Sequence, residues 1–493
     1  MKYYSTRDNS VKVTASEAIA QGLAPDGGLF VPESLPQVSL EEIETLCNLD
    51  YRTRASHIMG LFLEQFSTDE LDSFTRSAYG DNYDCAETAP VRKTDDNTAF
   101  LELWHGPTCA FKDMALQMLP HLLTASLKKN GENRQVCILV ATSGDTGKAA
   151  LEGFRDVDGT KILVFYPRDG VSDVQKLQMT TQEGTNVRVC AVSGNFDDAQ
   201  TGVKRIFSDK EMAAALSERG YFLSSANSIN WGRLLPQIVY YFSSYCDCIK
   251  NGMIKPGGKL DFCVPTGNFG NILAGWYAKQ MGLPVGRFIC ASNSNNVLTA
   301  FIESGVYDRN RPFYTTASPS MDILVSSNLE RLLYSFSGDS AEIRGYMSSL
   351  SETGRYEVSE RIARAVTQEF SAGFCGDDKT FETIARYWND KRYLIDTHTA
   401  VAAAVLEDYR ARTGQITPTV VVSTASPFKF SDSVIKALGG NAELPGAELV
   451  PALSQLTGIA PPAPLAGLDK RTVRFADCVE ASEMQEVVMD FLK

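Results

Sequence analysis

The sequence predicts an α/β protein with open parallel β-sheets, and two observations lead to this prediction. Short apolar runs of strand length recur along the chain, and segments with a helical spacing of apolar residues lie between them. The strands are expected at residues 135–142, 161–167, 186–192, 260–266, 287–292 and 419–424. Because these runs are apolar at successive positions, they indicate parallel sheets that helices cover on both faces.

The first residues, 1–95, are expected to form a separate and mainly helical unit. Residues 22–36 are rich in turn formers, with Pro-Asp-Gly-Gly at their centre. A helical pattern follows over residues 39–66, and it begins at a capping box formed by Ser39 and Glu42. This unit therefore precedes the alternating strands and helices.

The rest of the chain divides into two α/β domains. The acidic stretch at residues 93–98 resembles a linker. Residues 96–134 and 250–493 are expected to form the larger α/β domain, and residues 135–249 the smaller one. Helices are expected between residues 300 and 390.

The composition restricts the possible partners. The chain has 493 residues, of which 44% are hydrophobic, so it can bury a sizeable core. The 47 Lys and Arg against 60 Asp and Glu give a net charge of −13. Such a surface repels nucleic acid and anionic membranes, so neither is an expected partner. An anionic substrate would need local cations to hold it.

Several features favour a cytoplasmic location. The 11 cysteines are scattered without a C-x-x-C pair, which is typical of reduced and mostly buried thiols. The N-terminus lacks the apolar core of a signal peptide, and no apolar run approaches the ~20 residues of a membrane span. With four histidines and no H-E-x-x-H pattern, no metal site is expected.

The stretch HGPTCAFKDMALQ places a lysine at the start of an apolar helix. Gly106 and Pro107 break the chain, and Thr108 can cap the helix that follows. The helix is expected from the spacing of Phe111, Met114, Ala115, Met118, Leu119, Leu122 and Leu123. Lys112 lies near the positive end of this helix, which favours its neutral, nucleophilic form and hence imine chemistry. On this stretch alone, an ordinary surface lysine is the simpler interpretation.

Three of the expected strands end in unusual loops, and ligands of open α/β sheets bind beyond the carboxyl ends of strands. The first loop, residues 143–147, is not a Walker loop, because that motif needs Gly at Thr142 and Ser or Thr at Ala149. The second loop precedes a helix and contains Gly267, Asn268, Phe269, Gly270 and Asn271. Its glycines and the helix N-terminus predict a phosphate site.

The third loop has hydroxyls at Ser423, Thr424 and Ser426, which by themselves are ordinary turn residues. Together with Lys112 and the glycine-rich loop, they match the requirements of pyridoxal 5'-phosphate. The lysine would hold the aldehyde of this cofactor, the loop its phosphate, and a hydroxyl its ring nitrogen.

The chain resembles the threonine synthase family over nearly its whole length. The matching segments, in the family's order, are YSTR, GLAPDGGLFVPE, HGPTCAFKD, ATSGDTGKAA, NSINWGRLLPQ, PTGNFGN and STASPFKF. The resemblance implies the tryptophan-synthase-β-like fold, with two open α/β domains and a mainly helical N-terminal unit. It also implies a pyridoxal-phosphate-dependent lyase that converts O-phospho-L-homoserine and water to L-threonine and phosphate, the last step of threonine biosynthesis.

The resemblance further implies roles for individual residues. Lys112 should hold the cofactor covalently, and Thr424 should face the pyridine nitrogen. The other cofactor-binding residues should be Asp145, Gly267, Asn268, Phe269, Gly270 and Asn271. The substrate should bind to Ser143, Thr146, Lys148, Asn227, Asn230 and Arg233. Lys148 and Arg233 are the candidates for its phosphate group, with an ordinary surface cation as the alternative for each.

One segment departs from the family's pattern. Where the family usually has STAHPAKF, this chain has Ser426 in place of His and Phe428 in place of Ala. Any role of that histidine is therefore in doubt here. Cys109 is interpreted as a packing residue, and Asp396 and His398 are expected to order the wall of the site.

Two alternative functions stay open. One is a related lyase that eliminates phosphate from the same substrate but releases 2-oxobutyrate, and Ser426 keeps this alternative open. The other is a protein that binds the cofactor without catalysis, against which the intact Lys112 and the three loops argue. The sequence leaves the oligomeric state open.

Overall fold

The computed structural model of the chain describes residues 1–10, 12–142, 144–168 and 171–493. Two β-sheets, of six and five strands, dominate these residues. Both sheets are parallel except at one edge of the larger sheet, where two strands run antiparallel. The α/β fold class expected from the sequence is therefore confirmed.

The N-terminal unit combines a small antiparallel sheet with helices. Its elements are β1 (Tyr3–Ser5), β2 (Lys12–Val13), α1 (Ala15–Gln21), β3 (Phe30–Pro32), α2 (Leu40–Cys47), α3 (Tyr51–Gly60) and α4 (Thr68–Ala78). The capping box of Ser39 and Glu42 begins α2 as expected, but the helical pattern splits into two helices. The second helix starts because the Asp50 carboxylate caps it by accepting a hydrogen bond from the Thr53 N–H.

The larger sheet has the strand order β14-β11-β10-β15-β5-β4. Its strands are β4 (Val91–Lys93), β5 (Thr98–Glu102), β10 (Leu260–Pro265), β11 (Val285–Ser292), β14 (Phe370–Phe374) and β15 (Thr419–Ser423). The strands expected at residues 260–266, 287–292 and 419–424 are thus confirmed. Lys93 lies opposite Ala99 in the antiparallel pair of β4 and β5, so the acidic stretch between them is a tight turn and not a linker.

Helices cover both faces of the larger sheet. Three of them are α11 (Trp231–Lys250), α12 (Gly270–Gln280) and α18 (Thr397–Thr413). Phe262 and Val264 of β10 pack in the core that contains α11 and α12, whereas Cys263 packs in the core that contains α18. This burial on two sides accounts for the consecutive apolar residues of the strand.

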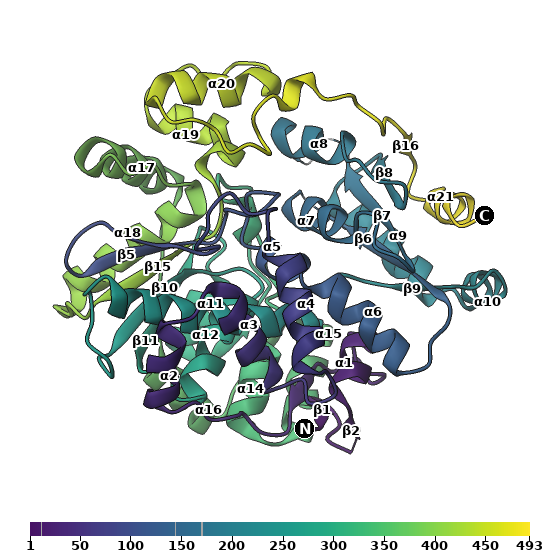
Figure 1. Cartoon of the computed structure of the whole chain (residues 1–493), viewed down its shortest axis with the longest axis horizontal. Helices are drawn as coiled ribbons and strands as arrows, with labels where there is room; N and C mark the ends of the chain where they lie inside the picture. Colours follow the sequence, from purple (N-terminus) through teal and green to yellow (C-terminus); the bar gives the residue numbers. More distant parts are fainter. Residues whose placement is uncertain (11, 143, 169–170) are drawn as a thin grey trace.

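The smaller sheet has the order β16-β8-β7-β6-β9. Its strands are β6 (Gln135–Ala141), β7 (Thr160–Pro167), β8 (Val187–Val192), β9 (Tyr221–Ser224) and β16 (Cys478–Val479). Figure 1 shows the yellow C-terminal chain running from α20 (Gly446–Thr457) across to β16 and α21 (Met484–Phe491), beside this sheet. The end of the chain therefore lies with the smaller sheet, although its position in the sequence groups it with the larger one.

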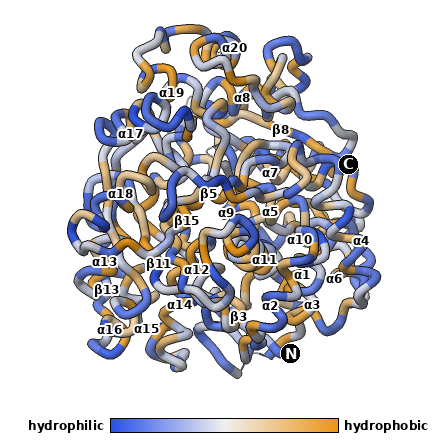
Figure 2. The backbone as a smooth tube through the Cα atoms, turned by 60° about the vertical axis from the view of Figure 1, so that its left-hand side comes forward, coloured by the Kyte–Doolittle hydropathy of each residue, from blue (hydrophilic) through white to orange (hydrophobic). Residues whose placement is uncertain are grey.

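The remaining elements connect the strands or cover the sheets. They are α5 (Asp113–Leu116), α6 (Leu119–Lys129), α7 (Asp145–Phe154), α8 (Asp173–Thr180), α9 (Phe196–Ser208), α10 (Lys210–Glu218), α13 (Val297–Ser304), β12 (Val306–Asp308), η1 (Pro319–Met321), α14 (Leu329–Ser337), α15 (Ser340–Thr353), β13 (Arg355–Glu357), α16 (Glu360–Glu369), α17 (Asp377–Lys391), η2 (Pro427–Phe430), α19 (Ser431–Ala437) and η3 (Leu468–Lys470). The helices expected between residues 300 and 390 are confirmed. Figure 2 shows that α17 is largely hydrophilic, whereas α20 contains many hydrophobic residues.

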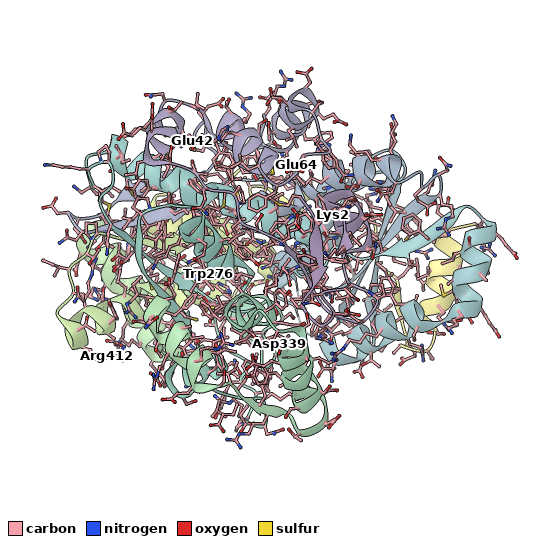
Figure 3. All side chains as sticks on the ribbon, turned by 90° about the horizontal axis from the view of Figure 1, so that it is seen from below. Lys2, Glu42, Glu64, Trp276, Asp339 and Arg412 are labelled. Atoms are coloured by element: carbon pink, nitrogen blue, oxygen red, sulfur yellow. The ribbon has the colours of Figure 1, made fainter. Side chains whose placement is uncertain are left out.

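Polar and apolar side chains separate as expected for a folded globular chain. Seen from below, exposed Glu42 and Arg412 lie toward the rim, and buried Trp276 lies closer to the centre (Figure 3). All 11 cysteines are free, and all except Cys85 and Cys478 are buried. Among the described residues, no helix is both long and apolar enough to cross a membrane. The same residues contain no cluster of His, Cys, Asp and Glu suited to a metal ion.

Candidate active site

The segment that carries Lys112 is tied to the end of β15. Ala110 and Ala425 form an isolated antiparallel bridge, and the Phe111 N–H donates a hydrogen bond of 2.8 Å to the Thr424 carbonyl. Two loops that are more than three hundred residues apart in the sequence therefore run side by side. The lysine and the hydroxyl-bearing loop lie at one place because of this pairing.

The helix expected over residues 111–123 is interrupted. Lys112 immediately precedes the four-residue helix α5, and α6 begins after a break. Pro120 accounts for the break, because it has no N–H to donate to the carbonyl four residues earlier. Thr108 does not cap α5. Its N–H and its hydroxyl instead donate to the two carboxylate oxygens of Asp113, at 2.8 and 2.6 Å.

Lys112 is buried, with 9% of its surface exposed. Its Nζ lies 3.3 Å from the Ser320 hydroxyl oxygen and 3.5 Å from a carboxylate oxygen of Asp145. Burial lowers the pKa of Lys112; Asp145 acts to raise it. The positive charges of Lys429 and Arg233 lower the pKa further, so the pKa of Lys112 lies below that of an ordinary lysine. The sequence pattern attributed this effect to a helix dipole, whereas in the structure burial and nearby cations cause it.

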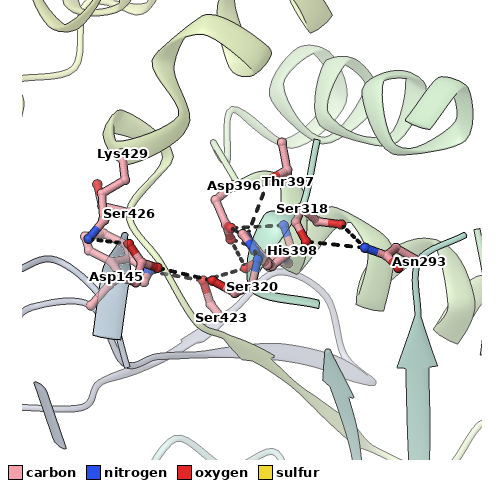
Figure 4. A network of polar contacts seen from close by, with 12 residues as sticks. Asp145, Asn293, Ser318, Ser320, Asp396, Thr397, His398, Ser423, Ser426 and Lys429 are labelled. Carbon is pink, nitrogen blue, oxygen red and sulfur yellow. Dashed lines mark hydrogen bonds and ion pairs between the residues drawn. The ribbon is translucent and has the colours of Figure 1, made fainter. Parts of the chain in front are cut away.

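Asp145 is the first residue of α7 and faces two lysines. One of its carboxylate oxygens accepts from Lys429 Nζ at 2.8 Å and from Gln175 Nε2 at 2.9 Å, and the other accepts from the Ser320 hydroxyl at 3.3 Å. Burial acts to raise the pKa of Asp145, but Lys429 and Lys112 hold it below its usual range, so the carboxyl is ionised. We call Lys429, Asp145 and Lys112 the ion row (Figure 4 shows its Lys429–Asp145 contact).

The glycine-rich loop, residues 267–271, ends at the N-terminus of α12. Phe269 occupies the cap position with a φ of 63°, and the first N–H groups of the helix, beginning with Gly270, have no partner within the helix. The Asn271 Nδ2 is buried without a hydrogen-bond partner among the described residues. A Cβ added to Gly267 would lie 2.7 Å from the Ser320 carbonyl oxygen, so only glycine fits there. These unused donors suit a small anion.

Residues just before α14 hold this loop in place. The Ser326 hydroxyl donates to the Gly267 carbonyl at 2.7 Å, and the Asn328 side chain donates to the Asn268 carbonyl at 3.0 Å. Asn328 also donates to the Ser228 carbonyl at 3.3 Å. The sequence interpretation did not identify this support, because the residues that provide it have ordinary loop composition.

The three hydroxyls at the end of β15 and just after it have different surroundings. The Ser423 hydroxyl accepts from Trp104 Nε1 at 3.0 Å, and the Ser426 hydroxyl accepts from the Phe428 N–H at 3.3 Å. The Thr424 hydroxyl makes no hydrogen bond within the part of the chain that the structure describes. The Thr424 hydroxyl thus has neither an acceptor nor a donor among the described residues, whereas the oxygens of the other two hydroxyls already accept hydrogen bonds.

Arg233 is an expected substrate-binding residue whose positive charge acts to lower the pKa of Lys112. It is 4% exposed, and burial lowers the pKa of its guanidinium to about 10. Nη1 donates to the Ala226 carbonyl at 2.7 Å, while Nε has no partner among the described residues. Arg233 therefore brings a buried cation with an unused donor to the site.

Other expected substrate-binding residues have different surroundings. Lys148 forms an ion pair with Glu152 at 2.9 Å and donates to Gln182, so its charge is already compensated. Asn230 caps α11, with its oxygen accepting from the Gly232 N–H at 2.8 Å and its Nδ2 donating to the Ile19 carbonyl.

Two further expected residues, Asn227 and Thr146, are less buried than Arg233. Asn227 is exposed, and its side-chain oxygen accepts from the Ile229 N–H at 3.3 Å. Thr146 is partly buried in the first turn of α7. Ser143 lies outside the residues that the structure describes. Among the expected substrate-binding residues that the structure describes, Arg233 is thus the one with a buried and unused donor.

Ser320 is a site residue that sequence reasoning missed. Its N–H donates to His398 Nε2 at 3.1 Å, which assigns the ring proton of that histidine to Nδ1, where Asp396 accepts it at 2.7 Å. Figure 4 shows this chain of contacts from Asp396 to Asp145. The geometry agrees with the expectation that Asp396 and His398 order the wall of the site.

Three family models match the chain. They are described as threonine synthase N terminus (residues 2–79), pyridoxal-phosphate dependent enzyme (residues 98–426) and threonine synthase, C-terminal (residues 399–488). Threonine synthase from Pseudomonas aeruginosa is 39% identical over 444 residues, which cover 90% of this chain and 91% of that protein.

Two further comparisons extend this result. Human threonine synthase-like 1 is 41% identical over 445 residues, and the match spans 87% of this chain but 59% of that longer protein. The crystal structure of pyridoxal-phosphate-bound threonine synthase from Brucella melitensis superposes with a TM-score of 0.89 at 38% identity, over the full length of both chains. The chain therefore belongs to the threonine synthase family of pyridoxal 5'-phosphate-dependent enzymes.

Proposed function

We propose that this chain converts O-phospho-L-homoserine and water to L-threonine and phosphate. The observation that carries the proposal is the position of Lys112. It is a buried lysine with a lowered pKa, and it lies beside the ionised Asp145 and next to the loop of Thr424. The nearby Arg233 supplies a cation for an anionic substrate, as a chain with a net charge of −13 requires.

The residues of the site fit the cofactor of the family. We propose that Lys112 holds it covalently and that its phosphate binds at the N-terminus of α12, where the Asn271 amide has an unused donor. The open hydroxyl of Thr424 would meet the ring nitrogen. The proposed cofactor-binding residues are Lys112, Asp145, Gly267, Asn268, Phe269, Gly270, Asn271 and Thr424. When bound, the cofactor supplies an electron-accepting ring that acidifies the Cα and Cβ protons of the substrate.

Lys112 would act as the base of the reaction once the amine of the substrate has displaced it and left it free. Its amine removes the proton from Cα and, in a later step, the proton from Cβ, and its ammonium returns protons to carbon. Asp145 stabilises this ammonium, since its carboxylate oxygen lies 3.5 Å from Nζ. Overall, the Cγ–O bond to phosphate breaks, a hydroxyl from water is added at Cβ, and a proton is returned to Cγ.

Arg233 binds the phosphate group of the substrate. Its Nε is buried and unpartnered, and a guanidinium can donate two parallel hydrogen bonds to one phosphate. Thr146, Asn227 and Ser143 stay in the proposal as polar groups around the substrate. Lys148 and Asn230 are less favoured, because Glu152 and the N-terminus of α11 already engage their side chains.

The test is to follow the product. Purified protein is incubated with O-phospho-L-homoserine in oxygen-labelled water, and the carbon skeleton is followed by NMR. L-threonine labelled at its hydroxyl oxygen is the expected product. Release of phosphate together with 2-oxobutyrate would instead identify the related lyase, and retention of the substrate would identify a non-catalytic cofactor-binding protein.

We also propose that the two sheets correspond to two domains that close over the substrate. The larger one would comprise residues 96–134 and most of 250–493, and the smaller one residues 135–249. The pairing of β16 with β8 supports adding the C-terminal strand and helix to the smaller domain. Closure between the domains would exclude water until hydration.

A further inference from the structure

Lys429 lies on η2 and is completely buried, with 0% of its surface exposed. Its Nζ donates to the Asp145 carboxylate at 2.8 Å and to the Thr108 carbonyl at 2.9 Å. Removing the charge of a lysine from water costs free energy. A protein in which apolar side chains replace a buried ion pair is often at least as stable as the original. Lys429 is not among the residues to which the family resemblance assigned a role, so its retention calls for an explanation.

The ion row gives Lys429 a route to the reacting amine. Asp145 lies between two lysines, with Lys429 on one carboxylate oxygen at 2.8 Å and Lys112 near the other at 3.5 Å. The three residues come from η2, from the first turn of α7 and from the segment before α5. Figure 4 shows Lys429 and Asp145 facing one another.

We propose that Lys429 is a positioning residue that acts through Asp145 to keep Lys112 available as a neutral base. The physical reason is competition for one negative charge. If Asp145 faced Lys112 alone, its carboxylate would hold a proton on that amine. Lys429 is closer to Asp145 and compensates its charge, which weakens this hold without removing the carboxylate that orients the amine.

The other charged groups around the row act consistently with this role. Arg233 is a further cation whose charge lowers the pKa of that amine. On the far side, Lys429 faces Asp113, a carboxyl whose pKa burial raises to about 6. The hydrogen bonds from Thr108 engage that carboxyl, so it does not replace Asp145 as the close partner of Lys429. The uncharged groups on Asp145 are the Gln175 amide and the Ser320 hydroxyl.

The inference rests on the proposed function only in naming Lys112 as the base. The competing explanation is that Lys429 merely ties η2 to α7 and to the turn at Thr108. A tie of this kind affects stability. It leaves the pKa of Lys112 unchanged, whereas the proposed role requires Lys429 to lower that pKa, opposite to the effect of Asp145.

The test measures the protonation of Lys112 in the full-length chain freed of its cofactor. Acetic anhydride acetylates neutral amines, so the rate of acetylation of the Lys112 peptide as a function of pH gives the pKa. Lys429→Met should raise this pKa by about one pH unit or more, and Asp145→Asn should lower it. At a pH below both values, acetylation of Lys112 should be about tenfold slower in Lys429→Met than in wild type.

A double variant decides whether the effect passes through Asp145. In the Asp145→Asn background, Lys429→Met should raise the pKa of Lys112 by less than it does alone. An equal rise in both backgrounds, or no rise in the single variant, would overturn the inference. This measurement uses no substrate, so it stands whether the product assay finds threonine or 2-oxobutyrate.

The chain offers a matched control. Lys279 also donates to one carboxylate, Glu369 at 2.8 Å, and to one carbonyl, Gly286 at 3.0 Å, but it lies at the end of α12 away from Lys112. Lys279→Met should leave the pKa of Lys112 unchanged.

A second set of measurements covers the case in which Lys429→Met does not fold. Lys429→Ala with added ethylammonium should recover the low pKa of Lys112 as the cation occupies the space of the missing side chain. In wild type itself, a pKa of Lys112 at or above the ordinary value of 10.5 would contradict the proposed role.

Discussion

The glycine-rich loop at residues 267–271 and the ion row are the two halves of the candidate site, and they are built from different groups. The loop presents backbone N–H groups at the N-terminus of α12, from residues that are neighbours in the sequence. The ion row consists of side chains from three distant segments. The function of the loop should therefore be sensitive to larger side chains, and that of the ion row to a change of side-chain charge or of pH.

The largest effect is expected at Lys112. Lys112→Ala removes the attachment of the cofactor and the base together, so turnover should fall by at least about 10³-fold. The visible absorption of the bound cofactor should disappear as well, which a spectrum of the purified protein measures. If borohydride reduction of wild type attached the cofactor to a different lysine, the assignment of the whole row to catalysis would be wrong.

Arg233 should affect the substrate and not the cofactor. Loss of a charge-assisted hydrogen bond costs roughly 1.5–3 kcal/mol. Arg233→Ala should therefore lower kcat/KM by about one to two powers of ten. Its cofactor spectrum should match wild type, and inhibition by free phosphate should weaken. Arg233→Lys serves as the charge-preserving control, and wild-type kinetics in both variants would remove this residue from the site.

A larger side chain at Gly267 tests the role of the glycine-rich loop. A Cβ at residue 267 would lie only 2.7 Å from the Ser320 carbonyl oxygen. Overpacking of this kind typically costs about 1–3 kcal/mol. Gly267→Val should raise the Kd of the cofactor about tenfold or more, as measured by reconstitution after dialysis. Gly345→Ala is the control, because an added Cβ there meets no atom of the described residues within 4 Å. Equal cofactor retention in both variants would place the phosphate elsewhere.

The smallest effect concerns the turn that leads to Lys112. Burial acts to lower the pKa of His105, but hydrogen bonds to Asp84 and Glu102 raise it to about 9 from an ordinary 6.5. A raised pKa stabilises the fold fully below the ordinary value, and the contribution is lost as pH rises through about 9. His105→Gln should thus lower Tm on the order of 2 °C near pH 6, and by less near pH 10. A difference in Tm that does not change with pH would show that the ion pairs contribute nothing.

Local pattern was sufficient for much of the fold and part of the site. The buried strands were recognised because two-sided burial makes them apolar at successive positions, as in β10 and β15. The loop at residues 267–271 was recognised because its glycines and the following helix are contiguous. The apolar spacing around Lys112 is regular and predicts one helix, whereas Pro120 at the start of α6 divides it in two.

Other residues were missed or assigned to the wrong neighbours. Ser320 lies in a stretch of the chain without a clear pattern, yet it reaches Lys112, Asp145 and His398. The position of Lys429 within the apolar stretch SPFKF indicates a buried lysine, but the sequence does not show which carboxylate it pairs with. The sequence makes Lys148 a candidate for the substrate phosphate, but in the structure its charge is compensated by Glu152.

The order of amino acids was enough to specify the fold class and to propose Lys112 as the reactive lysine and residues 267–271 as the anion loop, because each depends on residues that are close along the chain. The strength of Lys112 as a base depended on the folded arrangement. Its pKa reflects burial and the charges of Asp145, Lys429 and Arg233, which arrive from distant segments. Coulomb energy varies with distance in space and with the surrounding dielectric, and neither can be read from separation along the sequence.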